Sequence, residues 1–256
     1  MTLPPGYEAV PAQGAWGFAL LDAAPWAREV LADPGTLYAW AGGHPQASAM
    51  AGRGQVYSVP APVAGPDGHA RWVVRHYFRG GAVARWLDDR YLAVGEPRPL
   101  LEARVSSTAR ARHIPTPAVV AGAVYGDGVF YRADLVTELI PESSDLAEVL
   151  FGENPLGLGA EGALTAAGRL VRSLERTGVL HRDLNAKNIV LQRTPDGPRA
   201  HLVDLDRCGA RQVGVPAPTL PMRRRLERSL RKFEGRMGHY LPHGAWSALH
   251  KGFGDA

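Results

Sequence analysis

HRDLNAKNIVL (residues 181–191) and HLVDLDRC (residues 201–208) carry the most informative pattern in the chain. Asn188 follows Asp183 by five residues, and Asp204 follows Asn188 by sixteen. Phosphoryl transfer from ATP needs these side chains in this order. One carboxylate orients the acceptor hydroxyl and takes its proton, while a carboxamide and a second carboxylate hold Mg²⁺. The apolar segments IVLQ and AHLV predict a strand after the loop and another before Asp204. The alternative, a polar turn between two hairpin strands, accounts for fewer of these positions.

Length and composition favour a globular, cytoplasmic protein. The chain has 256 residues, 45% of them hydrophobic, which is enough for one two-lobed domain or two small ones with a real core. A single cysteine excludes a disulfide framework and a cysteine-based zinc site. We find no signal peptide and no apolar run of membrane-spanning length, so we expect a soluble or peripheral protein. The net charge of +4 and the pI of 9.4 favour an anionic partner.

Residues 50–79 predict a β-hairpin, with a turn at GPDG and a strand over ARWVVRHYF. Gly52, Arg53 and Gly54 form the turn that enters this hairpin. Backbone N–H groups in such a turn can approach a phosphate, because glycine has no Cβ to block it. Two interpretations stay open here: a turn that covers a nucleotide, and an ordinary turn.

A helix predicted over residues 97–112 carries Glu102, and the prolines of HIPTP end it. In a kinase-like lobe, a helix Glu pairs with a basic residue of the third strand, and this cation holds the α- and β-phosphates of ATP. Arg75 is the basic residue that we expect in this role. Protein kinases usually have Lys there, but Arg is always charged and can bind phosphate or carboxylate through two hydrogen bonds. An ordinary solvated carboxylate is the alternative for Glu102.

Residues 119–140 predict two strands around a Gly-Asp-Gly turn, and Pro141 ends the second strand. The order of the elements puts a hinge between lobes at Glu138, Leu139 and Ile140. Backbone groups of these three residues would then bind the edges of adenine.

Two helices lead from this hinge to the loop. ESSDLAEVLFG (residues 142–152) predicts a short helix with Ser143 or Ser144 as its N-cap. ALTAAGRLVRSLERTG (residues 163–178) predicts a longer amphipathic helix, which Gly178 ends.

The last informative segment is basic. PMRRRLERSLRKFEGRMG (residues 221–238) predicts an amphipathic helix with a cationic face. Three interpretations stay open for residues 222–237: a surface helix with a buried apolar stripe, a patch for anionic lipid headgroups or an anionic acceptor, and a nucleic-acid site. The third is disfavoured, because no aromatic residues are interleaved and no binding module is recognisable. We therefore expect no nucleic-acid partner.

The order of these motifs resembles the protein-kinase-like superfamily, and within it the 3-deoxy-D-manno-octulosonic acid (Kdo) kinases of lipopolysaccharide assembly. The likeness covers roughly residues 50–250. The segments that carry it are VVRHYFRGG (73–81), DDRYL (88–92), the Glu102 helix running into IPTP, FYRADLVTELIP (130–141), HRDLNAKNIVL, HLVDLDRC and RRLERSLRK (224–232).

The resemblance implies an α+β, bilobal protein-kinase-like fold. Residues 1–40 are then an N-terminal extension packed on the first lobe. Residues 41–140 are a small lobe with an antiparallel sheet and one key helix. Residues 141–256 are a larger, mainly helical lobe that ends in the basic helix.

The resemblance also implies transfer of the γ-phosphate of ATP, with Mg²⁺, to the 4-hydroxyl of a Kdo sugar on a lipid A precursor. The lipid-linked, anionic acceptor would place the protein at the cytoplasmic face of the inner membrane. By position, Asp183 is the catalytic base, Asn188 and Asp204 hold magnesium, and Arg75 contacts the phosphates with Glu102 as its partner.

Three positions depart from general kinase motifs. Asn185 replaces the Lys that protein kinases have two residues after the catalytic Asp, which argues against a protein substrate. Asp206 replaces the Gly of Asp-Phe-Gly, a substitution that suits the Kdo kinases. Lys187 either binds the transferred phosphate or faces solvent. The competing functions are a heptose or other small-molecule kinase of the same fold, and a pseudokinase that binds nucleotide or lipid without transfer.

Overall fold

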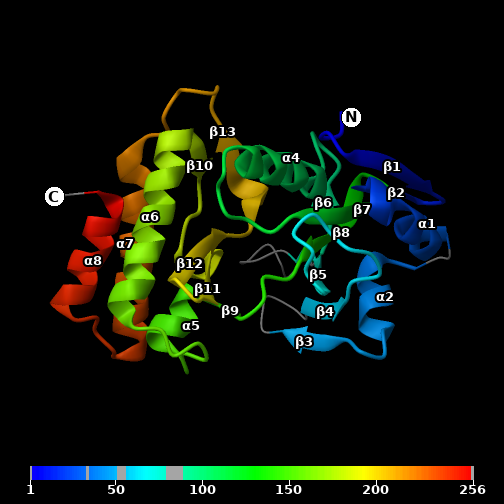
Figure 1. The fold of residues 1–256 in the computed structure, drawn as a ribbon. Helices are drawn as coiled ribbons and strands as arrows, with labels where there is room; N and C mark the ends of the chain where they lie inside the picture. Colours follow the sequence, from blue (N-terminus) through cyan, green and yellow to red (C-terminus); the bar gives the residue numbers. More distant parts are fainter. Residues whose placement is uncertain (1, 33–34, 51–55, 79–88, 255–256) are drawn as a thin grey trace. The chain divides into compact units, whose positions relative to one another are not determined.

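The computed structural model describes residues 2–32, 35–50, 56–78 and 89–254. The chain forms two compact units (Figure 1). The first contains residues Met1–Ser107 and Pro117–Leu139, and the second contains Thr108–Thr116 and Ile140–Ala256. The boundary at Ser107 falls within helix α4, which therefore belongs in part to each unit.

Within the described residues, the strands of the first unit form one antiparallel sheet of eight strands in the order β1-β2-β7-β8-β5-β4-β3, with β6 paired to β8. The hairpin and the pair of strands around Gly-Asp-Gly that the sequence predicts are confirmed as β4–β5 and β7–β8. The strands are β1 (Tyr7–Ala12), β2 (Ala15–Leu20), β3 (Ser48–Met50), β4 (Val56–Pro60), β5 (Arg71–His76), β6 (Tyr91–Leu92), β7 (Val119–Asp127) and β8 (Phe130–Glu138).

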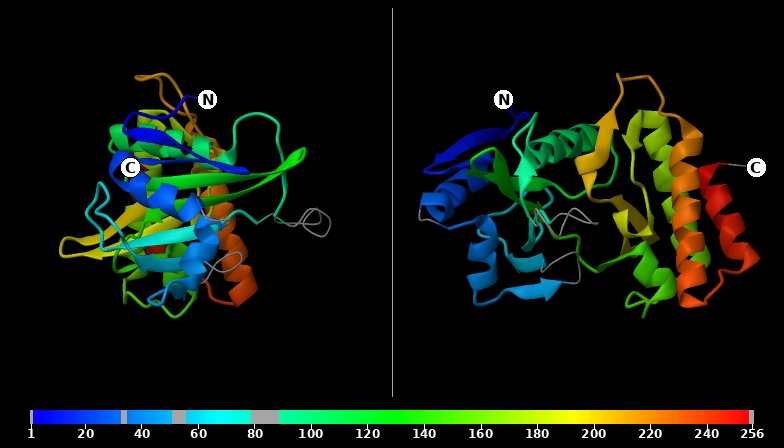
Figure 2. Two further views of the ribbon diagram at one scale, coloured as in Figure 1. Left: turned by 90° about the vertical axis from the view of Figure 1, so that its right-hand side faces the viewer. Right: turned by 180° about the vertical axis from the view of Figure 1, so that it is seen from behind.

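Helices cover both faces of this sheet (Figures 1 and 2). On one face, a short 3₁₀ turn (Leu21–Ala23), α1 (Ala24–Ala32) and α2 (Leu37–Gly43) pack on a core that contains the completely buried Trp72 and Val74 of β5. On the other face, α4 (Arg98–Ala111) packs on a core that contains Leu135 of β8. Strand β8 presents alternate side chains to these two cores, because Val136 belongs to the first and Leu135 to the second.

The second unit is mainly helical. Its helices are α5 (Leu146–Phe151), α6 (Ala160–Thr177), α7 (Thr219–Met237) and α8 (His243–Phe253). Its strands are β9 (Ser143–Asp145), β10 (Val179–His181), β11 (Ile189–Thr194), β12 (Gly197–Leu202) and β13 (Cys208–Ala210), with 3₁₀ turns at Ala186–Asn188 and Leu205–Arg207. α6 lies against α8 so closely that a Cβ added to Gly168 would be 2.8 Å from the Cα of Gly252.

These bounds confirm three of the predicted helices and correct one predicted N-cap. The α4, α6 and α7 helices are confirmed, and Gly178 ends α6 with a left-handed backbone at φ +75°. The N-cap prediction for the short helix is wrong. Ser143 and Ser144 belong to strand β9, and the cap of α5 is Asp145, whose carboxylate accepts from the backbone N–H of Glu148.

No helix in the part of the chain that the structure describes is long and apolar enough to cross a membrane.

Candidate functional site

The first cluster of predicted residues joins β5 to α4 within the first unit. Arg75 Nη2 lies 2.5 Å from Glu102 Oε2. The Tyr77 hydroxyl donates to the same carboxylate oxygen at 2.7 Å, and the Arg75 guanidinium lies 4.5 Å from the centre of the Tyr77 ring. Glu102 is only 4% exposed, so the solvated alternative for this residue is excluded. The expected ion pair is present, and the contact of Arg75 with phosphate stays a prediction.

His76 follows Arg75 on β5, and its side chain lies on the opposite face of the sheet. Its Nδ1 is 2.6 Å from Asp134 Oδ1, and its Nε2 is 3.1 Å from Asp89 Oδ2. Asp134 is completely buried, and its other oxygen accepts from the Tyr38 backbone N–H and the Tyr125 hydroxyl. Burial lowers the pKa of His76, but the hydrogen bonds and charges of Asp134 and Asp89 outweigh it and raise that pKa. This network anchors β5 beside Arg75.

The predicted hinge segment is already engaged in hydrogen bonds. The backbone N–H groups of Glu138 and Leu139 donate to backbone carbonyls of the first unit at 3.0 and 2.9 Å. The buried Glu138 carboxylate accepts from the backbone N–H of Asp67 at 3.0 Å, and burial raises the pKa of this carboxyl. A Cβ added to Gly65 would lie 2.4 Å from Glu138 Oε1, so a larger residue there would have to displace the Glu138 carboxylate. Adenine contacts at residues 138–140 stay a prediction, and they would need other backbone groups.

The second cluster lies in the second unit, on the loop that follows β10. Three contacts hold the main chain of Asp183. Its N–H donates to His181 Nδ1 at 3.1 Å, and its carbonyl accepts from the side-chain amides of Asn185 and Asn188 at 2.9 and 3.0 Å. The Asp183 side chain is 62% exposed and lies 3.8 Å from Arg207. The loop thus fixes the backbone of Asp183 and leaves its carboxylate accessible.

Asn188 and Asp204 are brought together by the β11–β12 pair. Ile189 pairs with Leu202, and the backbone N–H of Val203 donates to the Asn188 carbonyl at 3.0 Å. Asp204 itself has a left-handed backbone, with φ +60° and ψ +63°. Residues other than glycine rarely adopt this conformation, and it often marks a functional site. The two predicted metal ligands are therefore neighbours within one unit.

The donor set of Asn188 and Asp204 suits magnesium. The Asn188 amide nitrogen donates to Asp183, which leaves the amide oxygen for a cation. Among the described residues there is no group of three or more His, Cys, Asp or Glu that could hold a metal. Magnesium fits this arrangement, because proteins usually bind it through one or two side chains together with substrate phosphates and water. The metal assignment stays a prediction.

His181 supports the loop. It is completely buried, and burial lowers its pKa, so the neutral ring can accept the Asp183 N–H. Lys187 is exposed on the same loop, and both of its interpretations stay open. Gly52, Arg53 and Gly54, the predicted nucleotide turn, lie outside the described residues.

Sequence reasoning missed the part of α7 that holds this loop. Ser229 Oγ accepts the Ala186 backbone N–H at 3.1 Å, and Met222 Sδ accepts the His181 backbone N–H at 3.4 Å. The signal that could have revealed Ser229 is its place in the helix. It lies seven residues after the completely buried Met222, on the apolar stripe, where a polar side chain needs a partner.

Comparisons with known proteins agree on one family. The sequence model of the lipopolysaccharide kinase (Kdo/WaaP) family matches residues 48–252. A 3-deoxy-D-manno-octulosonic acid kinase of Actinobacillus succinogenes is 33% identical over 184 residues, which are 70% of this chain and 74% of that protein. The enzyme of the same name from Haemophilus influenzae is 32% identical over 180 residues, covering 69% and 72%. That of Xanthomonas euvesicatoria is 34% identical over 206 residues, covering 79% and 76%.

Among solved structures, the fold is similar to that of WaaP in a complex with acyl carrier protein. The TM-score is 0.52 at 18% sequence identity, and the match covers 91% of this chain and 87% of WaaP. The expected protein-kinase-like fold is thereby confirmed.

Proposed function

The chain belongs to the lipopolysaccharide kinase (Kdo/WaaP) family, and from this we propose that it transfers the γ-phosphate of ATP to the 4-hydroxyl of a Kdo sugar on a lipid A precursor. Membership makes it a kinase, a phosphotransferase that acts on a hydroxyl group. The choice of Mg²⁺, of the 4-hydroxyl and of the lipid-linked acceptor is our proposal. This acceptor would bring the reaction to the cytoplasmic face of the inner membrane.

The observation that carries the proposal is the arrangement of the loop of the second unit. The Asp183 backbone is held by three hydrogen bonds while its carboxylate is exposed. In the proposed reaction this carboxylate accepts the proton of the sugar hydroxyl as that oxygen attacks phosphorus. The fixed backbone keeps the carboxylate in position. Positioning of the reacting groups, together with electrostatic stabilisation, supplies most of the rate enhancement of a phosphoryl transfer.

The other residues would hold and neutralise the nucleotide. Asn188 and Asp204 are our candidates for holding Mg²⁺, which when bound would neutralise the phosphate charge. Arg75 would contact the α- and β-phosphates, and the buried Glu102 would keep its guanidinium from turning away. Glu138, Leu139 and Ile140 would contact adenine through backbone groups, and Lys187 is a candidate for the transferred phosphate.

The test is an acceptor panel. The protein is incubated with ATP and saturating Mg²⁺ together with Kdo-lipid A, a heptosylated lipopolysaccharide core or an aminoglycoside, and phosphate transfer is measured. We expect transfer to Kdo-lipid A alone. Transfer to heptose or the aminoglycoside would replace the proposed acceptor. ATP binding without transfer to any acceptor would support the pseudokinase alternative.

A further inference from the structure

One face of helix α7 is buried against the rest of the second unit. Its apolar stripe, Met222, Leu226 and Leu230, is completely buried in the second unit. The same side of the helix holds the loop through Ser229. This stripe is therefore unavailable for insertion into a bilayer, so an insertion of α7 is excluded.

The other face of α7 is cationic and exposed. Arg224, Arg228 and Lys232 recur every four residues, so they follow one stripe along the outer side of the helix. Arg236 in the last turn and Lys251 of α8 are exposed as well. None of these five cations forms an ion pair with a carboxylate among the described residues. Their charge is therefore available to an external anionic partner.

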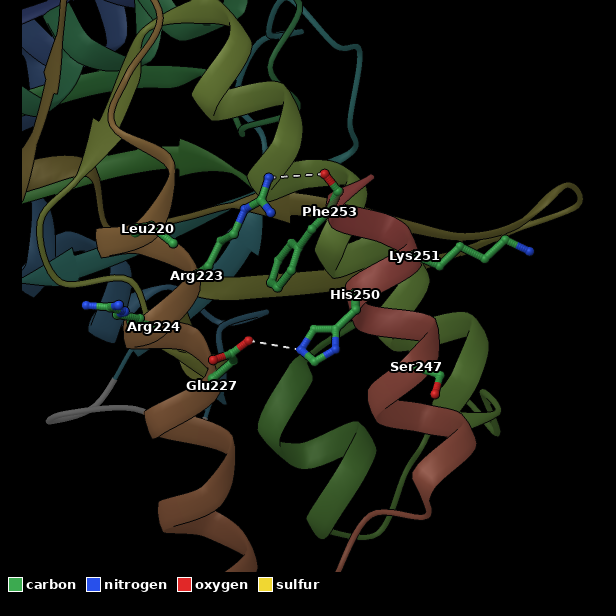
Figure 3. A pocket seen from close by; sticks show the side chains of 8 residues that line it. All are labelled: Leu220, Arg223, Arg224, Glu227, Ser247, His250, Lys251 and Phe253. Carbon is green, nitrogen blue, oxygen red and sulfur yellow. Dashed lines mark hydrogen bonds and ion pairs between the residues drawn. The ribbon is translucent and has the colours of Figure 1, made fainter. Parts of the chain in front are cut away.

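The groove between α7 and α8 does not form a closed anion pocket. It encloses about 740 Å³, but two contacts bridge it: Glu227 lies 3.0 Å from His250, and Arg223 donates to the Phe253 carbonyl at 3.1 Å. Arg223 is already neutralised by Glu175 at 2.8 Å. Arg224 and Lys251 extend away from the groove on either side (Figure 3). The unpaired charge thus faces outward, as suits an extended surface rather than a small ligand.

Exposed apolar side chains gather around the same helix. In the described part of the second unit, every large hydrophobic residue that is exposed lies in α7 or within six residues of its ends along the chain: Val213, Val215, Leu220, Met237 and Tyr240. Helix α6 gives a useful contrast. It carries exposed Arg169, Arg172 and Arg176, but no exposed large hydrophobic residue. Cations combined with aliphatic and aromatic side chains are typical of a segment that lies at a bilayer surface.

We propose that the α7 surface, defined as Arg224, Arg228 and Lys232 with Leu220 beside them, docks the protein on a bilayer of anionic phospholipids. The cations contact lipid phosphates, and Leu220 lies at the headgroup boundary. The biological sense of this docking rests on the proposed lipid-linked acceptor. Because the inner side of α7 holds the Asp183 loop through Ser229, docking would fix this loop at a defined distance from the membrane.

The test compares two variants that remove the same charge. Arg224→Gln, Arg228→Gln and Lys232→Gln are combined in one protein, and Arg169→Gln, Arg172→Gln and Arg176→Gln in the other. Each is mixed with vesicles of phosphatidylglycerol or of phosphatidylcholine, without ATP or acceptor, and the bound fraction is measured by co-sedimentation. We expect the α7 variant to bind phosphatidylglycerol vesicles about a hundredfold more weakly than the wild type, from about 1 kcal/mol per cation. The α6 variant should bind as the wild type does.

Two further readouts keep the result unambiguous. Wild-type binding should weaken at high salt and be absent with phosphatidylcholine, because screening and loss of lipid charge remove the attraction. Activity toward a water-soluble Kdo saccharide should be unchanged in the α7 variant, which separates this proposal from the kinase proposal. Equal loss of binding in both variants, or binding that ignores salt and lipid charge, would overturn the docking surface.

Discussion

The Arg75–Glu102 cluster of the first unit and the Asp183 loop of the second unit differ in the burial of their carboxylates. Glu102 is buried and holds the Arg75 side chain at 2.5 Å. Asp183 is held by three hydrogen bonds at its backbone, while its carboxylate is 62% exposed and lies 3.8 Å from Arg207. A cationic side chain that binds phosphate benefits from a fixed partner such as Glu102, because the side chain then needs no reorganisation when the phosphate binds. A proton acceptor instead needs access to its substrate.

The largest effect should follow from changing the exposed carboxylate. Asp183→Asn keeps the size of the side chain but removes the proposed base, so turnover should fall about a thousandfold, as for loss of general-base catalysis. Affinity for ATP and the midpoint of thermal unfolding should change little, because this side chain makes no buried contact. Turnover, ATP binding and thermal unfolding check this together. Wild-type turnover in the variant would remove Asp183 from the reaction.

Removal of the buried carboxylate of Glu102 should lower the stability of the protein, unlike removal of the exposed carboxylate of Asp183. Glu102→Ala leaves the Arg75 guanidinium and the Tyr77 hydroxyl without their acceptor, which should lower the free energy of unfolding by about 3 kcal/mol. The KM for ATP should rise as well. Urea unfolding and steady-state kinetics are the measurements.

A matched control for Glu102→Ala is Glu96→Ala. Glu96 lies 2.9 Å from Arg104, but both side chains are partly exposed. Its loss should cost about 0.5 kcal/mol, as is usual for an exposed pair. Similar losses in the two variants would contradict the contrast between the clusters.

Ser229 tests whether the Asp183 loop depends on its backbone support. Ser229→Ala leaves the Ala186 N–H without its acceptor, and a buried unsatisfied N–H costs about 1–3 kcal/mol. If the loop shifts when this hydrogen bond is lost, kcat should drop about tenfold, which corresponds to about 1.4 kcal/mol. The KM for ATP should be unchanged. Ser229→Thr should restore kcat, and Ser247→Ala on the exposed side of α8 should have no effect. A rise in KM without a change in kcat would mean that Ser229 does not position the loop.

The smallest expected effect concerns how stability depends on pH, because His76 and His181 should contribute to this dependence with opposite signs. The pKa of His76 is raised, because Asp134 and Asp89 outweigh burial, so its contribution to stability is full below the unfolded pKa and is lost as pH rises through the folded pKa. The pKa of His181 is lowered by burial, so its contribution is present above the unfolded pKa and is lost as pH falls. The stability difference between the wild type and His76→Gln should therefore shrink as pH rises. The difference for His181→Gln should shrink as pH falls.

Urea unfolding at several pH values between about 5.5 and 8.5 covers the range in which histidine titrates. A stability difference for either variant that does not depend on pH would contradict the assigned environment of that histidine.

Contacts along the chain were predictable, and contacts across it were not, apart from the Arg75–Glu102 pair that the order of the motifs indicated. Local spacing, turn residues and prolines predict the α4, α6 and α7 helices, the neighbourhood of Asp183 and Asn188, and six of the strands, namely β4, β5, β7, β8, β11 and β12. Ser229 reaches its partner Ala186 across 43 residues, so only the packing of α7 reveals it. Tyr38 and Asp134 are 96 residues apart, and the only hint in the sequence is an Asp within the apolar segment that forms β8.

The N-terminal helices show a second limit. Helices α1 and α2 lie in an Ala-, Gly- and Pro-rich segment with weak periodicity, and tertiary packing on the sheet decides their structure. The identity of the acceptor sugar is a third limit, because no residue pattern in this sequence predicts by its chemistry alone which sugar is bound. Family membership, rather than side-chain chemistry, supports that part of the proposal.

The most direct test of the central claim is the structure of the product. The wild-type protein is incubated with ATP, Mg²⁺ and Kdo-lipid A, and the site of phosphorylation is determined by mass spectrometry and ³¹P NMR. We expect one new phosphate, on the 4-hydroxyl of Kdo, and about a thousandfold slower formation of this product with Asp183→Asn under the same conditions. A phosphate on another sugar or hydroxyl, or no phosphorylated product from the wild type, would contradict this expectation.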